Sequence, residues 1–112
     1  MRSEQSLDTA LIRLYGEFDR NCEEAFGEEL ERVLTDERRL ILDLRGLRYM
    51  DSTGLRMLIL VDNQSMRDGF ELIVLCGDRG IRQLLRETGL DGVIPVVDSH
   101  AGMVPASDSP VY

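Results

Sequence analysis

Two short apolar runs constrain the fold of this chain more than any other feature. Leu40 to Leu44, within "RRLILDLRGL", and the later "FELIVLCG" are both too short for independent helices. Runs of this kind are typical of strands that are covered on both faces. Between them, Leu55 to Met66 has the pattern of a helix that stops near Gly69. A strand, helix and strand in this order predict a parallel pair joined by a right-handed crossover.

The rest of the chain extends this alternation. Ala10 to Phe18 alternates roughly in apolar character, which predicts a strand. From Asn21 onward apolar residues recur at three- and four-residue steps, which predicts an amphipathic helix. Asp78 to Thr88 predicts a third helix that stops at the following glycine. Val93 to Val97 predicts a last short strand at a sheet edge, because Pro95 cannot donate a ladder hydrogen bond. The sequence therefore predicts an α/β fold with a mainly parallel sheet of four to five strands in β-α-β-α-β-α-β order.

Length and composition suit one domain. The chain has 112 residues, of which 43% are hydrophobic, and this is enough for a single core. We expect the domain to span residues 1–97, with 98–112 as a loosely ordered tail. The sequence shows neither the roughly 20 apolar residues of a membrane span nor a basic, then apolar, leader. A cytoplasmic location is the resulting expectation.

Charge and residue usage exclude several functions. The formal net charge is −8, and all thirteen basic residues are Arg. Such a surface repels phosphate backbones and anionic membranes, so we expect no direct nucleic-acid partner and no membrane partner. Cys22 and Cys76 do not form a metal-type pair, and His100 is the only histidine. The sequence thus predicts no metal site and no histidine-dependent catalysis, and both cysteines are expected to serve in packing.

The segment "YMDSTGLRML", residues 49–58, follows the central predicted strand and is the candidate functional site. Sites in parallel sheets usually lie at the carboxyl ends of the strands, and Asp19 also follows a predicted strand directly. One interpretation of the segment is a plain helix start, in which Asp51 or Ser52 caps the helix with about 1 kcal/mol. Gly54 weakens that interpretation, because glycine costs about 1 kcal/mol in a helix. A glycine here instead suggests that the helix start leaves clearance for a partner's backbone or a phosphate.

Three chemical interpretations compete with capping. A catalytic aspartate of the aspartic-protease type needs a different spacing to glycine and an all-β fold. A receiver domain phosphorylated on Asp43 needs paired acids and a lysine, which this chain lacks. Asp43 is instead expected to pair with an arginine or a backbone group. The third interpretation makes Ser52 a phosphoacceptor, because a phosphate at a helix N-terminus gains from free N–H groups and the helix dipole.

These motifs together resemble the STAS domains, and within them the anti-sigma factor antagonists of bacteria. "LYGEFD" (14–19) resembles the family's L-x-G-E-[LF]-D strand end. "LILDLRGLRYMDSTGLRMLI" (40–59) resembles its central strand, loop and phosphorylatable helix start. The later "ELIVLCG" and "IRQLLRETGLDGVIPV" keep the expected order, so the similarity covers Leu11 to Val97.

The resemblance implies a binding protein, not an enzyme, without a cofactor. Ser52 matches the serine that an anti-sigma factor with serine kinase activity phosphorylates, with Thr53 as the second choice. Asp19 and Asp51 match acidic positions on the end that faces the partner. Gly54 matches the glycine that keeps the helix start approachable.

The implied switch has two states. The unmodified protein binds the anti-sigma factor and releases the sigma factor for transcription, whereas the phosphorylated form cannot bind until a serine phosphatase restores it. The alternative is a structural STAS subunit of a stress-sensing scaffold or a lipid-transport complex. Two departures from the family stand out: Arg2 to Leu7 scarcely resembles its usual first strand, and Asp98 to Tyr112 shows no C-terminal helix.

The apolar residues 57–61 surround the second predicted helix instead of forming one stripe. We expect Leu55, Leu58 and Ile59 to face the sheet. Met57 and Leu60 point elsewhere, where a neighbouring helix covers them or, if they are exposed, they act as binding anchors. Met57 is accordingly included among the predicted partner-binding residues.

Overall fold

The computed structural model describes residues 1–6, 8–34 and 38–97. Its strands are β1 (Arg2–Ser6), β2 (Thr9–Phe18), β3 (Arg39–Met50), β4 (Glu71–Leu75) and β5 (Val96–Val97). Its helices are α1 (Glu23–Val33), α2 (Ser52–Asp68) and α3 (Arg79–Glu87), with short 3₁₀ turns η1 (Arg20–Cys22) and η2 (Leu90–Gly92). In the described residues the strands form one sheet in the order β1-β2-β3-β4-β5. The β1–β2 pair is antiparallel and the other pairs are parallel, which confirms the predicted α/β class.

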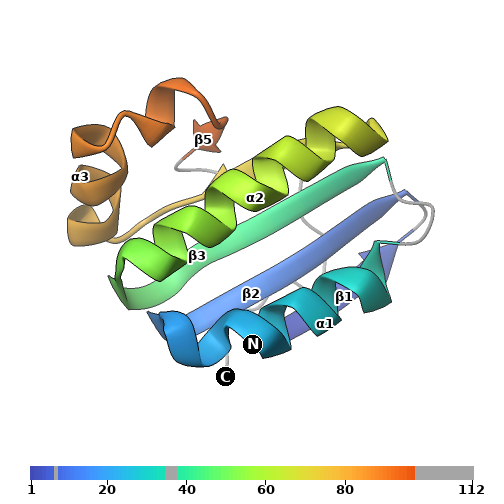
Figure 1. Cartoon of the computed structure of the whole chain (residues 1–112), viewed down its shortest axis with the longest axis horizontal. Helices are drawn as coiled ribbons and strands as arrows, with labels where there is room; N and C mark the ends of the chain where they lie inside the picture. The colour runs from blue at the N-terminus through green and yellow to red at the C-terminus, as the bar shows by residue number, and fades with distance from the viewer. Residues whose placement is uncertain (7, 35–37, 98–112) are drawn as a thin grey trace.

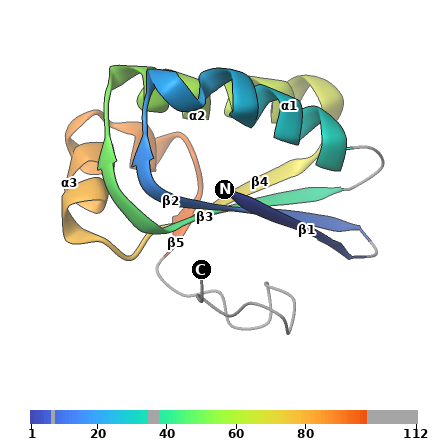
Figure 2. The ribbon, with the colours of Figure 1, turned by 90° about the horizontal axis from the view of Figure 1, so that it is seen from below.

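Helices α1 and α2 lie side by side over one face of the sheet, and α3 lies at the end where β3 leads into α2 (Figures 1 and 2). This helix-covered face holds the main core, because alternate residues of each strand point toward it. Ile12, Leu42 and Val74 come from three adjacent strands and are fully buried there. Full burial of such a side chain stabilises the fold by about 1.5–3 kcal/mol.

The other face of the sheet is also buried along its central strands. Leu11, Ile41, Ile73 and Leu75 are 0–6% exposed and form a second apolar cluster. The prediction that the central runs are buried on both faces is therefore confirmed. Two buried charged residues lie on this face as register partners on β2 and β3: Arg13 is 1% exposed and Asp43 is 4% exposed.

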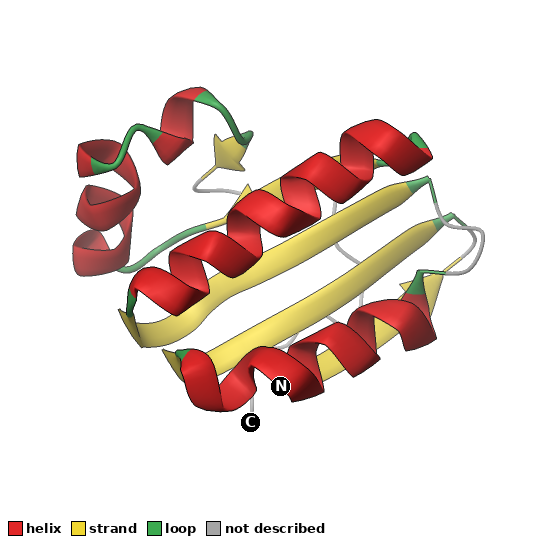
Figure 3. Ribbon diagram, in the orientation of Figure 1, coloured by secondary structure: helices red, strands yellow, loops and turns green. Residues whose placement is uncertain are grey.

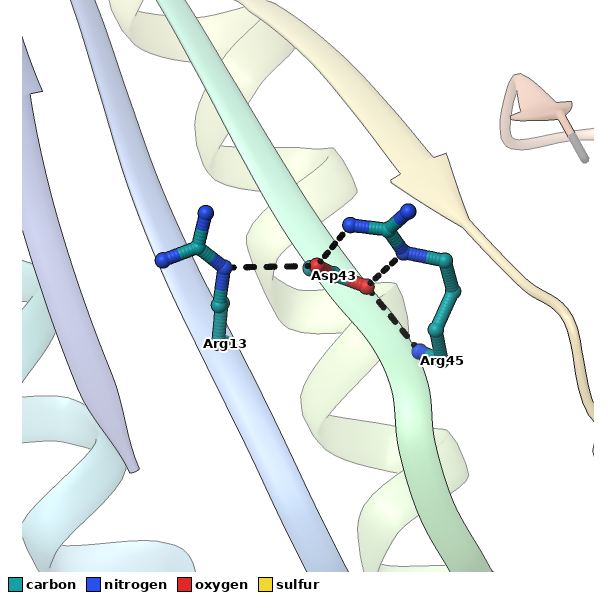
Figure 4. A network of polar contacts seen from close by, with 3 residues as sticks. All are labelled: Arg13, Asp43 and Arg45. Atoms are coloured by element: carbon teal, nitrogen blue, oxygen red, sulfur yellow. Dashed lines mark hydrogen bonds and ion pairs between the residues drawn. The ribbon is translucent and has the colours of Figure 1, made fainter. Parts of the chain in front are cut away.

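Asp43 is paired as the sequence predicted (Figure 4). The Arg45 guanidinium contacts both carboxylate oxygens, with 2.8 Å from Nε to Oδ1 and 2.7 Å from Nη2 to Oδ2, and the Arg45 backbone N–H donates to Oδ1 at 3.0 Å. Arg13 on β2 adds an ion pair at 3.5 Å. Burying a carboxylate costs stability unless it is paired and hydrogen-bonded, so this network has a structural role.

Helix ends follow the sequence signals. The Asp51 side chain caps α2, and the Asp78 side chain caps α3 by accepting a hydrogen bond from the Ile81 N–H at 3.0 Å. Helix α2 ends at Gly69, whose φ of +80° is a left-handed conformation that glycine adopts without strain. The predicted helix stop is thus confirmed.

Three strands differ from what the sequence pattern indicated. Residues 2–6 do form a strand, β1, which hydrogen-bonds to β2 although its sequence, RSEQS, is polar; an edge strand tolerates such a sequence. β3 is longer than predicted, because it continues past Leu44 to Met50 beside β2. β5 contains only Val96 and Val97, at the edge as predicted. The predicted tail, 98–112, lies outside the described residues.

Figure 3 shows helices α1 and α2 running along the long central strands, with α3 beyond one end of them. The longest of them, α2, has 17 residues. None of the described helices is long and apolar enough to cross a membrane.

Candidate functional site

Strands β2 and β3 end together, and their ends bring the two predicted acidic positions into one region. Phe18 and Met50 are register partners in the parallel ladder. Asp19 and Asp51 follow these two residues directly, so both lie at the carboxyl ends of neighbouring strands, as predicted. The beginning of α2 lies at this same end of the sheet (Figure 1).

Asp51 is the N-cap of α2. Its backbone is extended, with φ −102° and ψ −172°, and Oδ1 accepts a hydrogen bond from the Gly54 N–H at 3.0 Å. Its carbonyl accepts the first helical hydrogen bond, from the Leu55 N–H at 3.0 Å. Both contacts are those of an N-cap, which confirms the capping interpretation for Asp51. Capping leaves the role of Ser52 open, because Ser52 is not the capping residue.

Ser52 is the first residue of α2 and is exposed to solvent. Among the described residues, its hydroxyl has no hydrogen-bond partner. The backbone N–H groups of a first helical turn lack intrahelical partners, and the helix dipole places partial positive charge there. An accessible hydroxyl is therefore held beside groups that favour an anion. The neighbouring Thr53 is only half-exposed.

Gly54 has a role in internal packing. It is buried, and a Cβ at this position would lie 2.3 Å from the Phe18 carbonyl oxygen and 2.6 Å from Met50 Cγ. No side chain fits at such distances. The glycine thus allows the first turn of α2 to pack against the end of β2, a packing role that the sequence did not predict. The consequence is that Ser52 and Asp19 are fixed relative to each other.

Asp19 organises the neighbouring turn. Its Oδ1 accepts a hydrogen bond from the Asn21 N–H at 3.0 Å, which caps η1. The Cys22 thiol lies close by and donates to the Glu17 carbonyl at 3.3 Å. Both predicted acidic residues of the site are half-buried capping residues, and each leaves part of its side chain exposed at this end of the molecule.

An ion pair that the sequence pattern does not reveal joins α1 and α2 on the Ser52 side of α2. Arg56 Nη2 lies 2.6 Å from Glu23 Oε2, and both side chains are partly exposed, at 59% and 44%. Arg56 follows Ser52 by four residues, so the two side chains share one face of α2. The i, i+4 spacing was visible in the sequence, but the pairing with Glu23 depends on the placement of α1.

The faces of α2 are partly as predicted. Leu58 is fully buried and Leu55 packs against the core, whereas Ile59 is 42% exposed, so its predicted place against the sheet is wrong. Met57 is 3% exposed. It therefore packs in the core, the first of the two alternatives considered for it, and cannot act as an exposed anchor. Leu60, which lies with Met57 on the side of α2 that faces α1, is 54% exposed and accessible.

The two cysteines form no disulfide in the described part of the chain, and Cys76 lies in an unreactive setting. Cys76 is buried, and desolvation raises the pKa of its thiol above the ordinary value. A thiol with a raised pKa is a weak nucleophile at neutral pH. The predicted packing role of Cys76 agrees with this setting.

Comparison with known proteins identifies the family. The STAS domain model matches residues 1–103. A Bordetella bronchiseptica protein, BtrV, named as a candidate anti-sigma factor antagonist, is 32% identical over 80 residues, which cover 71% of this chain and 69% of BtrV. The chain belongs to the STAS domain family.

Solved structures share the fold. An anti-sigma factor antagonist from Mycobacterium paratuberculosis aligns with a TM-score of 0.79 at 20% identity, covering 91% of this chain and 87% of that one. The Bacillus cell fate determinant SpoIIAA in its phosphorylated form aligns with a TM-score of 0.70 at 19% identity, covering 91% and 95%. At these identities the likeness shows the fold, and the predicted architecture is confirmed.

Proposed function

We propose that this protein is a phosphorylation-controlled anti-sigma factor antagonist with Ser52 as the phosphoacceptor. The observation that carries the proposal is the position of Ser52, an exposed hydroxyl on the first residue of a capped helix. Relatives described as anti-sigma factor antagonists support the partner class, and the SpoIIAA structure in a phosphorylated form supports the chemistry. The partners would be an anti-sigma factor with serine kinase activity and a serine phosphatase, all acting in the cytoplasm.

The surroundings of Ser52 explain how a phosphate could change the surface. A phosphate adds about −1.5 to −2 charge at neutral pH, directly beside the Asp51 carboxylate. Repulsion from this carboxylate is opposed by the N–H groups of the first turn and by Arg56, one turn further along α2. Because Arg56 already pairs with Glu23 at 2.6 Å, a phosphate would compete with Glu23 for the guanidinium.

The proposed partner face contains Asp19, Asp51 and Ser52. The register of β2 and β3 places the two acids at one end of the sheet, and the caps hold their carboxylates in fixed positions. A basic surface on the anti-sigma factor would be attracted to this end when Ser52 is unmodified. Phosphorylation would introduce a bulky dianion into the centre of the contact, next to two carboxylates.

The experiment is intact-mass and fragment mass spectrometry of the protein purified from its own cells, in growth and under stress. We expect one phosphate on Ser52 in one condition and a loss of the phosphate in the other. Ser52→Ala should abolish the modification, and Thr53→Ala is the matched control that should leave it unchanged. An unmodified Ser52 in every condition, together with a stable multi-protein complex, would instead favour a structural STAS subunit.

A further inference from the structure

A groove between α1 and α2 is a second surface, whose lining shares Glu23 with the surroundings of Ser52. It has a volume of about 210 Å³, and Phe26, Leu30, Met57, Leu60 and Val61 contribute its apolar lining. Phe26, Met57 and Val61 are 1–3% exposed and form its floor, whereas Leu60 is 54% exposed. The two helices that form it lie side by side on the sheet (Figure 1).

Gly27 keeps this groove open. It lies inside α1, where glycine costs about 1 kcal/mol relative to alanine, and it lines the groove. A Cβ at Gly27 would meet no atom within 4 Å, and its φ is not in the left-handed region. Neither internal packing nor backbone conformation therefore requires glycine at this position. The residue makes sense if another molecule approaches the α1 backbone closely.

Three exposed carboxylates lie on α1 beside the groove but outside its lining, and we call them the acidic rim. Glu24 and Glu31 lie one turn before and one turn after Gly27, on the same side of α1, and Glu28 follows Gly27 directly. None of the three forms an ion pair with another residue in the described part of the chain. Glu23 closes one end of the groove through its ion pair with Arg56. An apolar floor beside a row of unpaired carboxylates fits an occupant with apolar side chains and adjacent cations.

We propose that the α1–α2 groove binds an amphipathic helix of a partner protein that carries Lys or Arg along one side of its apolar stripe. A helix in a groove is recognised through apolar anchors at i, i+3, i+4 and i+7, and the groove between α1 and α2 offers an apolar floor for such anchors. The chain's own residues 98–112 contain no Lys or Arg and so lack this chemistry. A second copy carries a net charge of −8 and is repelled by the same rim.

This inference goes beyond the proposed function, because binding in the groove does not require Ser52. The test uses the full chain and two labelled synthetic peptides of 18 residues, measured by fluorescence anisotropy. The basic peptide has Leu at i, i+3, i+4 and i+7 flanked by Arg, and the acidic peptide has Glu in place of each Arg. We expect the basic peptide to bind and the acidic peptide to bind at least about tenfold more weakly.

Matched variants localise the binding. Gly27→Leu fills the groove, and Leu60→Ser removes its exposed anchor, so each should weaken the basic peptide about tenfold or more. Ile59→Ser and Gly92→Leu are controls, because Ile59 is exposed on α2 outside the groove lining and a Cβ at Gly92 also meets nothing within 4 Å. Both should bind like wild type, as should Ser52→Asp. Thermal unfolding by circular dichroism checks that each variant is folded.

Three outcomes would overturn the proposal. The first is equal binding of the basic peptide by wild type, Gly27→Leu and Leu60→Ser. The second is equal affinity for the basic and acidic peptides. The third is a concentration-dependent dimer, seen by sedimentation, that Gly27→Leu dissociates while no peptide binds, because the occupant would then be a second copy. If Ser52→Asp retained peptide binding while Ser52 proved unmodified in cells, the groove would be supported as a binding site and the phosphorylation switch would be contradicted.

Discussion

Gly54 and Gly27 are both helical glycines, and their surroundings differ completely. At Gly54 a Cβ would lie 2.3 Å from a backbone oxygen, whereas at Gly27 it would meet nothing within 4 Å. Helix propensity disfavours both to a similar extent, by about 1 kcal/mol. The first glycine is explained by the packing of α2 on β2, and the second has no explanation inside the protein. The difference separates a residue needed for the fold from one that points to a partner.

The largest expected effect is that of Gly54→Ala. The new methyl group overlaps the Phe18 carbonyl, and the packed strand end cannot move freely, so the variant should lose roughly 2 kcal/mol of unfolding free energy. For a domain of this size that lowers Tm by roughly 10 °C. Thermal unfolding followed by circular dichroism measures it. An unchanged or higher Tm would show that the Phe18 carbonyl and the Met50 side chain move easily enough to accommodate the methyl group.

The cap contributes the next largest effect. Asp51→Ala removes the acceptor of the Gly54 N–H and should lower the unfolding free energy by about 1 kcal/mol in urea titrations. Asp51→Asn is the matched control, because an amide oxygen still caps the helix but carries no charge. If Asp51→Ala and wild type were equally stable, the helix start would depend on Gly54 packing alone.

Gly27→Ala should have the opposite sign. The methyl group fits into open space and replaces a poor helix former, so the unfolding free energy should rise by about 0.5–1 kcal/mol. Urea unfolding measures the change, and Gly54→Ala provides the contrast within the same helical layer. A destabilised Gly27→Ala variant would break the comparison, since it would mean that Gly27 also serves internal packing.

The smallest effect concerns Arg56. The Arg56–Glu23 pair is largely exposed, so Arg56→Gln should change the unfolding free energy by less than about 1 kcal/mol. In the phosphorylated protein its consequence is electrostatic: a nearby cation stabilises the dianion and lowers the second phosphate pKa from its usual value of about 6. Arg56→Gln should therefore raise the pKa of phosphorylated Ser52, as measured by ³¹P NMR titration. Identical titration curves would show that Arg56 stays with Glu23.

Much of the fold could be predicted from the sequence because the signals were local. The apolar runs predicted the central strands, and Asp51, Gly69 and Gly89 indicated helix boundaries. β1 was missed because an edge strand needs few apolar residues, and its pairing with β2 supplies the stability that its own sequence does not show. The true length of β3 depends likewise on β2, its partner beyond Leu44.

The candidate site could be predicted only in part. Motif order located Ser52, Asp51 and Asp19, and the register of β2 with β3 brings them to one end of the sheet. The role of Gly54 could not be read locally, because it depends on the Phe18 carbonyl 36 positions earlier in the chain. The exposure of Ile59 and the burial of Met57 also depend on where α1 packs. Helical periodicity alone does not show which side of α2 packs against α1.

The most direct test of the central claim compares the two forms of one protein against its partner. The anti-sigma factor that copurifies with the unmodified protein would be titrated with wild type, with wild type phosphorylated on Ser52, and with Ser52→Ala, by isothermal calorimetry. The account predicts tight binding by wild type and Ser52→Ala, and a loss of affinity of at least about tenfold, or 1.4 kcal/mol, on phosphorylation. Equal affinity of the phosphorylated and unmodified proteins would contradict it.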